Sequence, residues 1–100
     1  MNQLEKVSKA FADKNRLKMI EILIKEDMKV SEVADKMDIE ENLASHHLRV
    51  LSKNKILKSS KKGREVIYSI NKTKLLSVFK QLLKKPFFKD LIKEALKSSK

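Results

Sequence analysis

The hydrophobic period of this chain changes between residues 56 and 70, and that change limits the folds available to it. Elsewhere the apolar residues recur every three or four positions, the spacing of one face of an α-helix. Inside this window Val66, Tyr68 and Ile70 keep the two-residue period of a strand, and the only glycine, Gly63, precedes them. We therefore predict a β-hairpin over about 56–70. Its first strand is expected at Ile56–Ser60 and its turn at Lys61-Lys62-Gly63.

Helical spacing predicts four helices before the hairpin and two after it. Asp13 and Ser31 are placed to cap the second and third helices, and Asn71 to cap the fifth. Pro86 either ends the fifth helix or begins the sixth. The residues predicted to point inward are Leu17, Ile20, Leu23 and Ile24 in the second helix, Val33, Ala34 and Met37 in the third, and Ala44, Leu48 and Leu51 in the fourth.

The third and fourth helices are short, and Asp38 marks a tight turn between them. With the hairpin after the fourth helix, this order predicts a winged helix-turn-helix. The fold class is therefore mainly α with a small β-hairpin, in the order helix, helix, helix, helix, hairpin, helix, helix. We expect one domain over residues 1–100, a recognition helix over about 41–53 and a wing over about 56–70.

The whole chain has a formal net charge of +11. Its positive charge is concentrated in the second half of the sequence. Residues 1–52 hold 9 Lys and Arg against 10 Asp and Glu, whereas residues 53–100 hold 15 against 3. This asymmetry indicates a polyanionic partner, since contacts with phosphates dominate non-specific affinity for nucleic acids. A lysine-rich surface that serves only solubility is the alternative.

Several classes of function are excluded or disfavoured by what the sequence lacks. With no cysteine, disulfides and thiolate metal sites are impossible. No signal-peptide pattern and no apolar run of about 18 residues occurs, so we expect a cytoplasmic protein without a membrane partner. No nucleophilic or paired-carboxylate arrangement is visible, and one glycine cannot make a Gly-rich phosphate loop. We expect no enzyme activity and no cofactor.

Three segments resemble the ArsR family of bacterial and archaeal repressors. Residues 44–51 (ASHHLRVL) look like its recognition helix, residues 63–70 (GREVIYSI) like its wing, and residues 11–18 (FADKNRLK) like the start of its second helix. The likeness covers about residues 4–84. It implies a homodimer, an inverted-repeat operator and repression by occluding a promoter. It implies no particular ligand, so any small-molecule effector is unknown.

A recognition helix presents its exposed side chains to base edges in the major groove. The resemblance makes Ser45 and His46 the characteristic contact pair. Asn42 offers a donor and an acceptor to a base edge, and Leu43 could touch a thymine methyl group. With the basic residues of the helix and wing, the predicted DNA-binding residues are Asn42, Leu43, Ser45, His46, Arg49, Lys53, Lys61, Lys62 and Arg64.

Arg64 is the candidate for a narrow minor groove, where negative potential is concentrated. Lys55 and Lys58 add charge near it. His47 falls where helix-turn-helix motifs place an inward residue, so we expect a packed, hydrogen-bonded histidine. Glu40 and Glu41 depart from the family pattern. They favour the helix N-terminus through the macrodipole but repel phosphate, although Glu41 could accept from a cytosine amino group.

Metal sensing is not expected. Family members that sense metals use cysteines in the third helix, or Asp and His in the C-terminal helix pair. This chain has Lys29 and Ser31 at the first place, and Lys72 and Lys74 at the second. His46 and His47 are adjacent and point to different helix faces, so they cannot chelate one ion together.

The helices over about 3–12 and 72–97 carry more apolar residues than one side of a small core can bury, so we expect them to dimerise. The alternative is that the sixth helix covers this face within one chain, through Phe87 and Phe88. Two other functions stay open. A winged helix can serve as a protein-interaction module, and the basic, amphipathic residues 73–100 could bind an anionic membrane surface.

Overall fold

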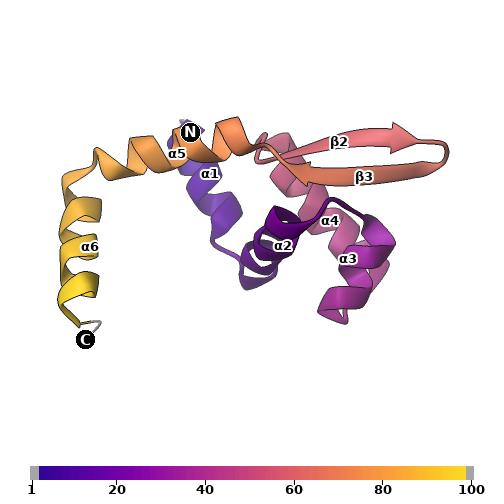
Figure 1. Cartoon of the computed structure of the whole chain (residues 1–100), viewed down its shortest axis with the longest axis horizontal. Coiled ribbons are helices and arrows are strands. Elements are labelled where there is room, and N and C mark those ends of the chain that lie inside the picture. The colour runs from indigo at the N-terminus through magenta and orange to yellow at the C-terminus, as the bar shows by residue number, and fades with distance from the viewer. Residues whose placement is uncertain (1–2, 99–100) are drawn as a thin grey trace.

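The computed structural model describes residues 3–98, and it confirms the predicted order of the helices and the hairpin. Figure 1 shows the hairpin extending to one side of a helical body and two C-terminal helices extending to the other. The helices are α1 (Gln3–Phe11), α2 (Lys14–Lys25), α3 (Val30–Met37), α4 (Glu41–Lys53), α5 (Lys72–Leu83) and α6 (Pro86–Ser98). The strands are β1 (Met28–Lys29), β2 (Leu57–Lys62) and β3 (Glu65–Ile70).

Helix ends follow the predicted caps at Asp13 and Asn71. The Asp13 carboxylate accepts from the backbone N–H groups of Asn15 at 2.8 Å and Arg16 at 3.2 Å, and Asn71 accepts from Lys74 N–H at 3.2 Å. These bonds satisfy amides that have no partner inside the helix. Pro86 begins α6.

The predicted cap at Ser31 is wrong. Helix α3 begins at Val30 with Lys29 as its N-cap residue, so Ser31 lies inside the first turn. Glu32 explains the earlier start, because its carboxylate accepts from Lys29 N–H at 3.1 Å. At the other end Asp38 adopts the left-handed conformation (φ 55°), which makes the predicted tight turn before α4.

The strands form an antiparallel sheet in the order β1-β3-β2. Strand β1 was not predicted, because its two residues show no period of their own and are defined only by pairing with Tyr68 and Ile67. The predicted turn was placed too early: Lys61 and Lys62 belong to β2, whose first residue is Leu57.

The loop of the hairpin is Gly63-Arg64, and Gly63 has the positive φ (62°) that such tight loops require. Every β2 residue after Leu57 is exposed, so that strand has no hydrophobic alternation to mark its end.

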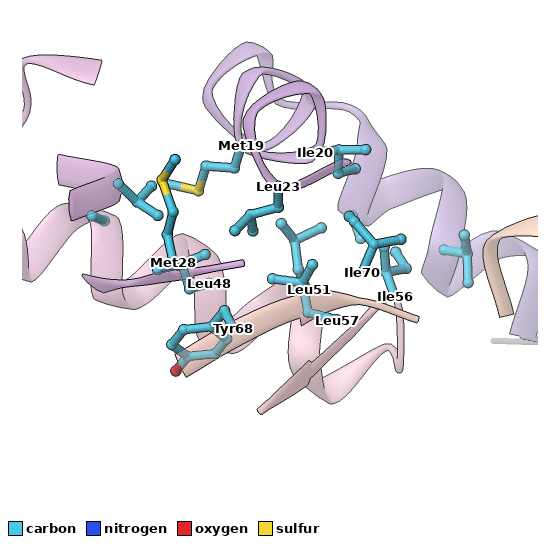
Figure 2. Close-up of a cluster of buried hydrophobic side chains, with 14 of the residues drawn as sticks. Met19, Ile20, Leu23, Met28, Leu48, Leu51, Ile56, Leu57, Tyr68 and Ile70 are labelled. Atoms are coloured by element: carbon cyan, nitrogen blue, oxygen red, sulfur yellow. The ribbon is translucent and has the colours of Figure 1, made fainter. Parts of the chain in front are cut away.

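The core lies where α2 and α4 pack on the sheet, and Figure 2 shows its side chains. Met19, Ile20 and Leu23 are the buried residues of α2. The prediction that Leu17 and Ile24 point inward is wrong, since they are 49% and 56% exposed. Met19 is fully buried instead, so the inward face of α2 lies on the side of Met19 and not on the side of Leu17 and Ile24. The inward residues predicted for α4 are confirmed: Ala44, Leu48 and Leu51 have no exposed surface.

Helices α5 and α6 form an arm that lengthens the molecule (Figure 1). The radius of gyration is 15.1 Å, against about 13 Å for a compact domain of this length. In the arm Val78 is buried, while Leu76, Phe79 and Leu83 are 56%, 48% and 46% exposed. Thus α6 leaves these three side chains uncovered within one chain. The side chain of Phe87, one of the two predicted to cover this face, lies outside the described residues.

Candidate nucleic-acid interface

Helix α4 has two opposite faces, one buried and one polar. Its buried face includes Ala44, His47 and Leu48. Asn42, His46, Arg49 and Lys53 are all exposed, and they follow one another at spacings of four, three and four residues. Residues at these spacings share one side of a helix. The α4 outer face is our term for Asn42, His46, Arg49 and Lys53.

Leu43 and Ser45 flank the α4 outer face on its two sides. Leu43 is 42% exposed, which is unusual for a large apolar residue and leaves its methyl groups available to a partner. Ser45 is half-buried, whereas the neighbouring His46 is exposed. Both predicted residues can thus reach a partner that approaches this helix.

The hairpin presents the other predicted residues. Lys61 and Lys62 at the end of β2 and Arg64 in the loop are all exposed. Lys58 lies on the same strand and is also exposed, so one strand and its loop carry four cations. We call residues 58–66 the distal wing.

The tip of the distal wing and the start of α4 border the same groove. This groove, of about 280 Å³, is lined by residues of the α3 start, the α4 start and the wing tip. Arg64 and Glu41 both line it, so the predicted minor-groove residue and the first residue of α4 border one groove. Glu40 is the α4 N-cap residue, but its side chain accepts no capping hydrogen bond. The Glu40 carboxylate can therefore stabilise α4 only through its interaction with the helix dipole.

Two basic residues that were not predicted lie near the other end of α4. Lys6 and Lys9 of α1 line a groove of about 380 Å³ together with Arg16 and Lys53. These lysines were missed because the first half of the chain has a net charge close to zero, which hides a local cluster. Only the packing of α1 near the end of α4 brings them together.

His47 is the buried histidine that the sequence predicted. It is 6% exposed, and its Nδ1 accepts a hydrogen bond from Arg16 Nε at 3.2 Å. A second nitrogen of Arg16, Nη1, donates to the carbonyl of Ala10 at 3.3 Å. One guanidinium therefore joins α1, α2 and α4. This role of Arg16 was not predicted, because it depends on a contact across 31 positions of the chain.

The hydrogen bond from Arg16 requires an unprotonated Nδ1. Burial lowers the pKa of His47 below 6.5, and the nearby charges of Arg16 and His46 lower it further, against the opposing effect of Asp13. The cap carboxylate differs: burial raises the pKa of Asp13, but the hydrogen bonds from Arg16 and Asn15 outweigh this and bring it below 3.8.

Stability is expected to fall when the solution is acidified below pH 6.5. Because the pKa of His47 is lower in the folded state, the unfolded chain binds the proton first, and stability is lost as pH falls through the folded pKa. Urea unfolding between pH 8 and pH 5 measures this loss. His47→Gln keeps an acceptor and should remove the pH-dependent step, whereas His46→Gln should retain it. An equal step in wild type and His47→Gln would contradict the assignment. Asp13 does not interfere, since its contribution is lost only below pH 3.8.

In the described residues, no three His, Asp or Glu side chains converge as metal ligands would. The two places where the resemblance puts metal ligands hold Lys29 with Ser31 and Lys72 with Lys74, and Lys29 forms an ion pair with Glu65 at 3.1 Å. An ammonium group repels a cation, so these residues do not fit a metal site. Within residues 3–98, moreover, no helix is long and apolar enough to cross a membrane.

The fold defines a class of protein: helices α3 and α4, joined at Asp38–Glu40 and followed by a hairpin, make a winged helix-turn-helix. Solved structures share this fold. The ArsR-like transcriptional regulator from Rhodococcus sp. RHA1 matches with a TM-score of 0.77 at 24% identity, over 95% of this chain and 90% of that one. HlyU from Vibrio cholerae matches with a TM-score of 0.69 at 21% identity, over 81% and 88%.

Sequence comparison gives the family. The model of the bacterial regulatory proteins of the arsR family matches residues 13–59. The transcriptional repressor SdpR of Bacillus subtilis is 32% identical over 72 residues, 72% of this chain and 80% of SdpR. A cadmium resistance regulatory protein, CadC of Listeria innocua, is 37% identical over 71 residues.

The chain belongs to the ArsR family, which consists of transcriptional regulators rather than enzymes. It spans 80% of SdpR, but only 60% of the Listeria CadC and 61% of the SmtB homolog of Synechocystis sp..

Proposed function

We propose that this protein is a cytoplasmic, sequence-specific DNA-binding repressor that acts as a homodimer on an inverted-repeat operator. The observation that carries the proposal is the α4 outer face: four polar or basic side chains lie along one side of a helix, away from the core, with a cationic wing nearby. An α-helix fits the major groove, and a basic hairpin can lie along the adjacent backbone.

Relatives and structural neighbours support the repressor and homodimer parts of this proposal. SdpR and the SmtB homolog of Synechocystis sp. are named transcriptional repressors. Mb0332 from Mycobacterium bovis, which shares the fold with a TM-score of 0.69 at 23% identity, is described as a homodimeric winged helix-turn-helix DNA-binding domain.

The exposed residues divide by chemistry into two groups. Asn42 can form two hydrogen bonds with a base edge, Leu43 can touch a thymine methyl group, and Ser45 and His46 can bond to bases or phosphates. The charged side chains bind the phosphate backbone, which sets affinity and orientation rather than sequence. In this second group we place Arg49, Lys53, Lys61, Lys62 and Arg64.

Dimerisation is proposed through α1 and the arm. Leu76, Phe79 and Leu83 share one side of α5 and are about half exposed. A two-fold axis at this surface buries the same residues of both protomers. It also separates two recognition helices, as an inverted repeat requires.

We further propose that this regulator responds to no metal. CadC of Listeria innocua is named for cadmium resistance, but this chain has no cysteine and has lysines where the resemblance places metal ligands. The cationic residues there are Lys29, Lys72 and Lys74.

Fluorescence anisotropy tests the proposed function. The DNA upstream of the protein's own coding region is compared with a scrambled duplex, at two salt concentrations, and the stoichiometry is measured. We expect the native duplex to bind two chains and to stay bound at the higher salt. Equal binding to both duplexes that disappears at the higher salt would refute the repressor and leave a merely basic protein.

Two alanine variants separate phosphate contacts from base readout. Arg64→Ala should weaken binding to every duplex and lower the salt slope by about one unit. Asn42→Ala should cost about 1–3 kcal/mol on the native duplex and nothing on the scrambled one. Anisotropy titrations over a salt series measure both effects. Identical salt slopes for wild type and Arg64→Ala would place Arg64 outside the phosphate contacts.

A further inference from the structure

In the part of the chain that the structure describes, the distal wing packs against the core only through the partly buried Val66. Its β2 residues are all exposed, and β1 pairs with β3 only at Tyr68 and Ile67, closer to the core. A hydrogen bond and ion pair from Lys29 Nζ to Glu65 Oε1, at 3.1 Å, joins the wing tip to the N-cap residue of α3. The Glu65 hydrogen bond also raises the pKa of Lys29.

Lys29 is itself fixed in place on both sides. Its backbone pairs with Ile67 in the sheet, and its N–H donates to the Glu32 carboxylate at 3.1 Å as the N-cap of α3. The ammonium group of Lys29 therefore projects from a rigid junction between the sheet and the first helix of the motif. Glu65 adjoins Arg64, and both line the groove that reaches Glu41 at the start of α4.

From these contacts we propose that Lys29 and Glu65 are positioning residues for DNA binding. Their ion pair holds the wing tip against the helix-turn-helix, so that Arg64 keeps a fixed place relative to the recognition helix. The pair touches no base in this role. The ion pair restricts the conformations of the wing tip before DNA binds. Less conformational entropy is then lost on binding, which is how preorganisation increases affinity. The inference rests on the proposed DNA binding.

A variant of Glu65 tests the proposal, because a charge effect and a positioning effect change the DNA affinity in opposite directions. Glu65→Thr removes the carboxylate, keeps a residue suited to strands and leaves a side chain too short to reach Lys29. If charge alone mattered, losing a negative charge beside Arg64 would strengthen DNA binding. If the pair positions the wing, the native duplex should bind about two- to fivefold more weakly, the range for an exposed ion pair.

A matched control comes from the ion pair between Lys18 and Glu21, at 3.6 Å, which joins two residues of the same helix. Glu21→Ala removes an equal charge, but the ion pair that it breaks lies within α2 and connects no two elements. It should therefore not weaken DNA binding. Lys29→Met should weaken binding, and Lys29→Met with Glu65→Thr should be no weaker than Lys29→Met alone. Unchanged or tighter binding by Glu65→Thr, or losses that add in the double variant, would overturn the proposal.

Amide hydrogen exchange keeps this test independent of DNA. Glu65→Thr should accelerate exchange at residues 61–66 about two- to fivefold, whereas Glu21→Ala should not. If wild type binds no DNA specifically, the proposed function fails, and exchange still decides whether the ion pair holds the wing. Unchanged exchange at the wing tip would refute the positioning role.

Discussion

Leu51→Ala is expected to destabilise the domain by about 2–5 kcal/mol, the range for a buried leucine cut to alanine. Leu51 has no exposed surface and belongs to the cluster that joins α2, α4 and the sheet. Figure 2 shows it among Leu23 of α2 and Leu57 of β2. Its carbonyl also accepts from Ile56 N–H at 3.0 Å, where the chain leaves α4 for the wing. The loss is a large part of the roughly 5–15 kcal/mol typical of a domain.

Leu43→Ala is the matched control for this prediction. It makes the same chemical change in the same helix, but Leu43 is 42% exposed and lies outside the core. Urea unfolding followed by circular dichroism should show a change within about 0.5 kcal/mol for Leu43→Ala. Similar unfolding midpoints for the two variants would mean that the cluster around Leu51 does not stabilise the fold.

Helix α4 could be predicted from sequence because two independent patterns agree there. Its buried face repeats at helical spacing, and the change of period after it fixes where it ends. The predicted bounds of about 41–53 match Glu41–Lys53. His47 could also be assigned to the buried side, since its position in the helix decides that side.

Features that depend on tertiary contacts could not be predicted. Strand β1 exists only through its pairing with β3, and the Arg16–His47 bond joins residues 31 positions apart. The inward face of α2 was misplaced for a related reason. Leu17, Met19, Ile20 and Ile24 are all apolar, so spacing alone does not choose among them, and packing on the sheet selects Met19 and Ile20.

Phe79→Glu is expected to separate the dimer that we propose. Phe79 is 48% exposed in one chain, between Leu76 and Leu83 on the same side of α5. A carboxylate there removes apolar burial and places an unpaired charge in the interface. Because a two-fold interface contains the residue twice, the cost is counted twice. We expect about 3 kcal/mol or more, at least a hundredfold in the dimer dissociation constant.

Gln81→Glu provides the control, because it adds the same charge to the same helix on a different side. Sedimentation equilibrium should show a monomer for Phe79→Glu and a dimer for Gln81→Glu and wild type. Circular dichroism should remain helical for all three, since Phe79 lies outside the core cluster. Operator binding should weaken with dimerisation, because a monomer contacts one half-site. If Phe79→Glu sediments as wild type does, the exposed side of α5 is not the interface, and the apolar residues must contact some other partner.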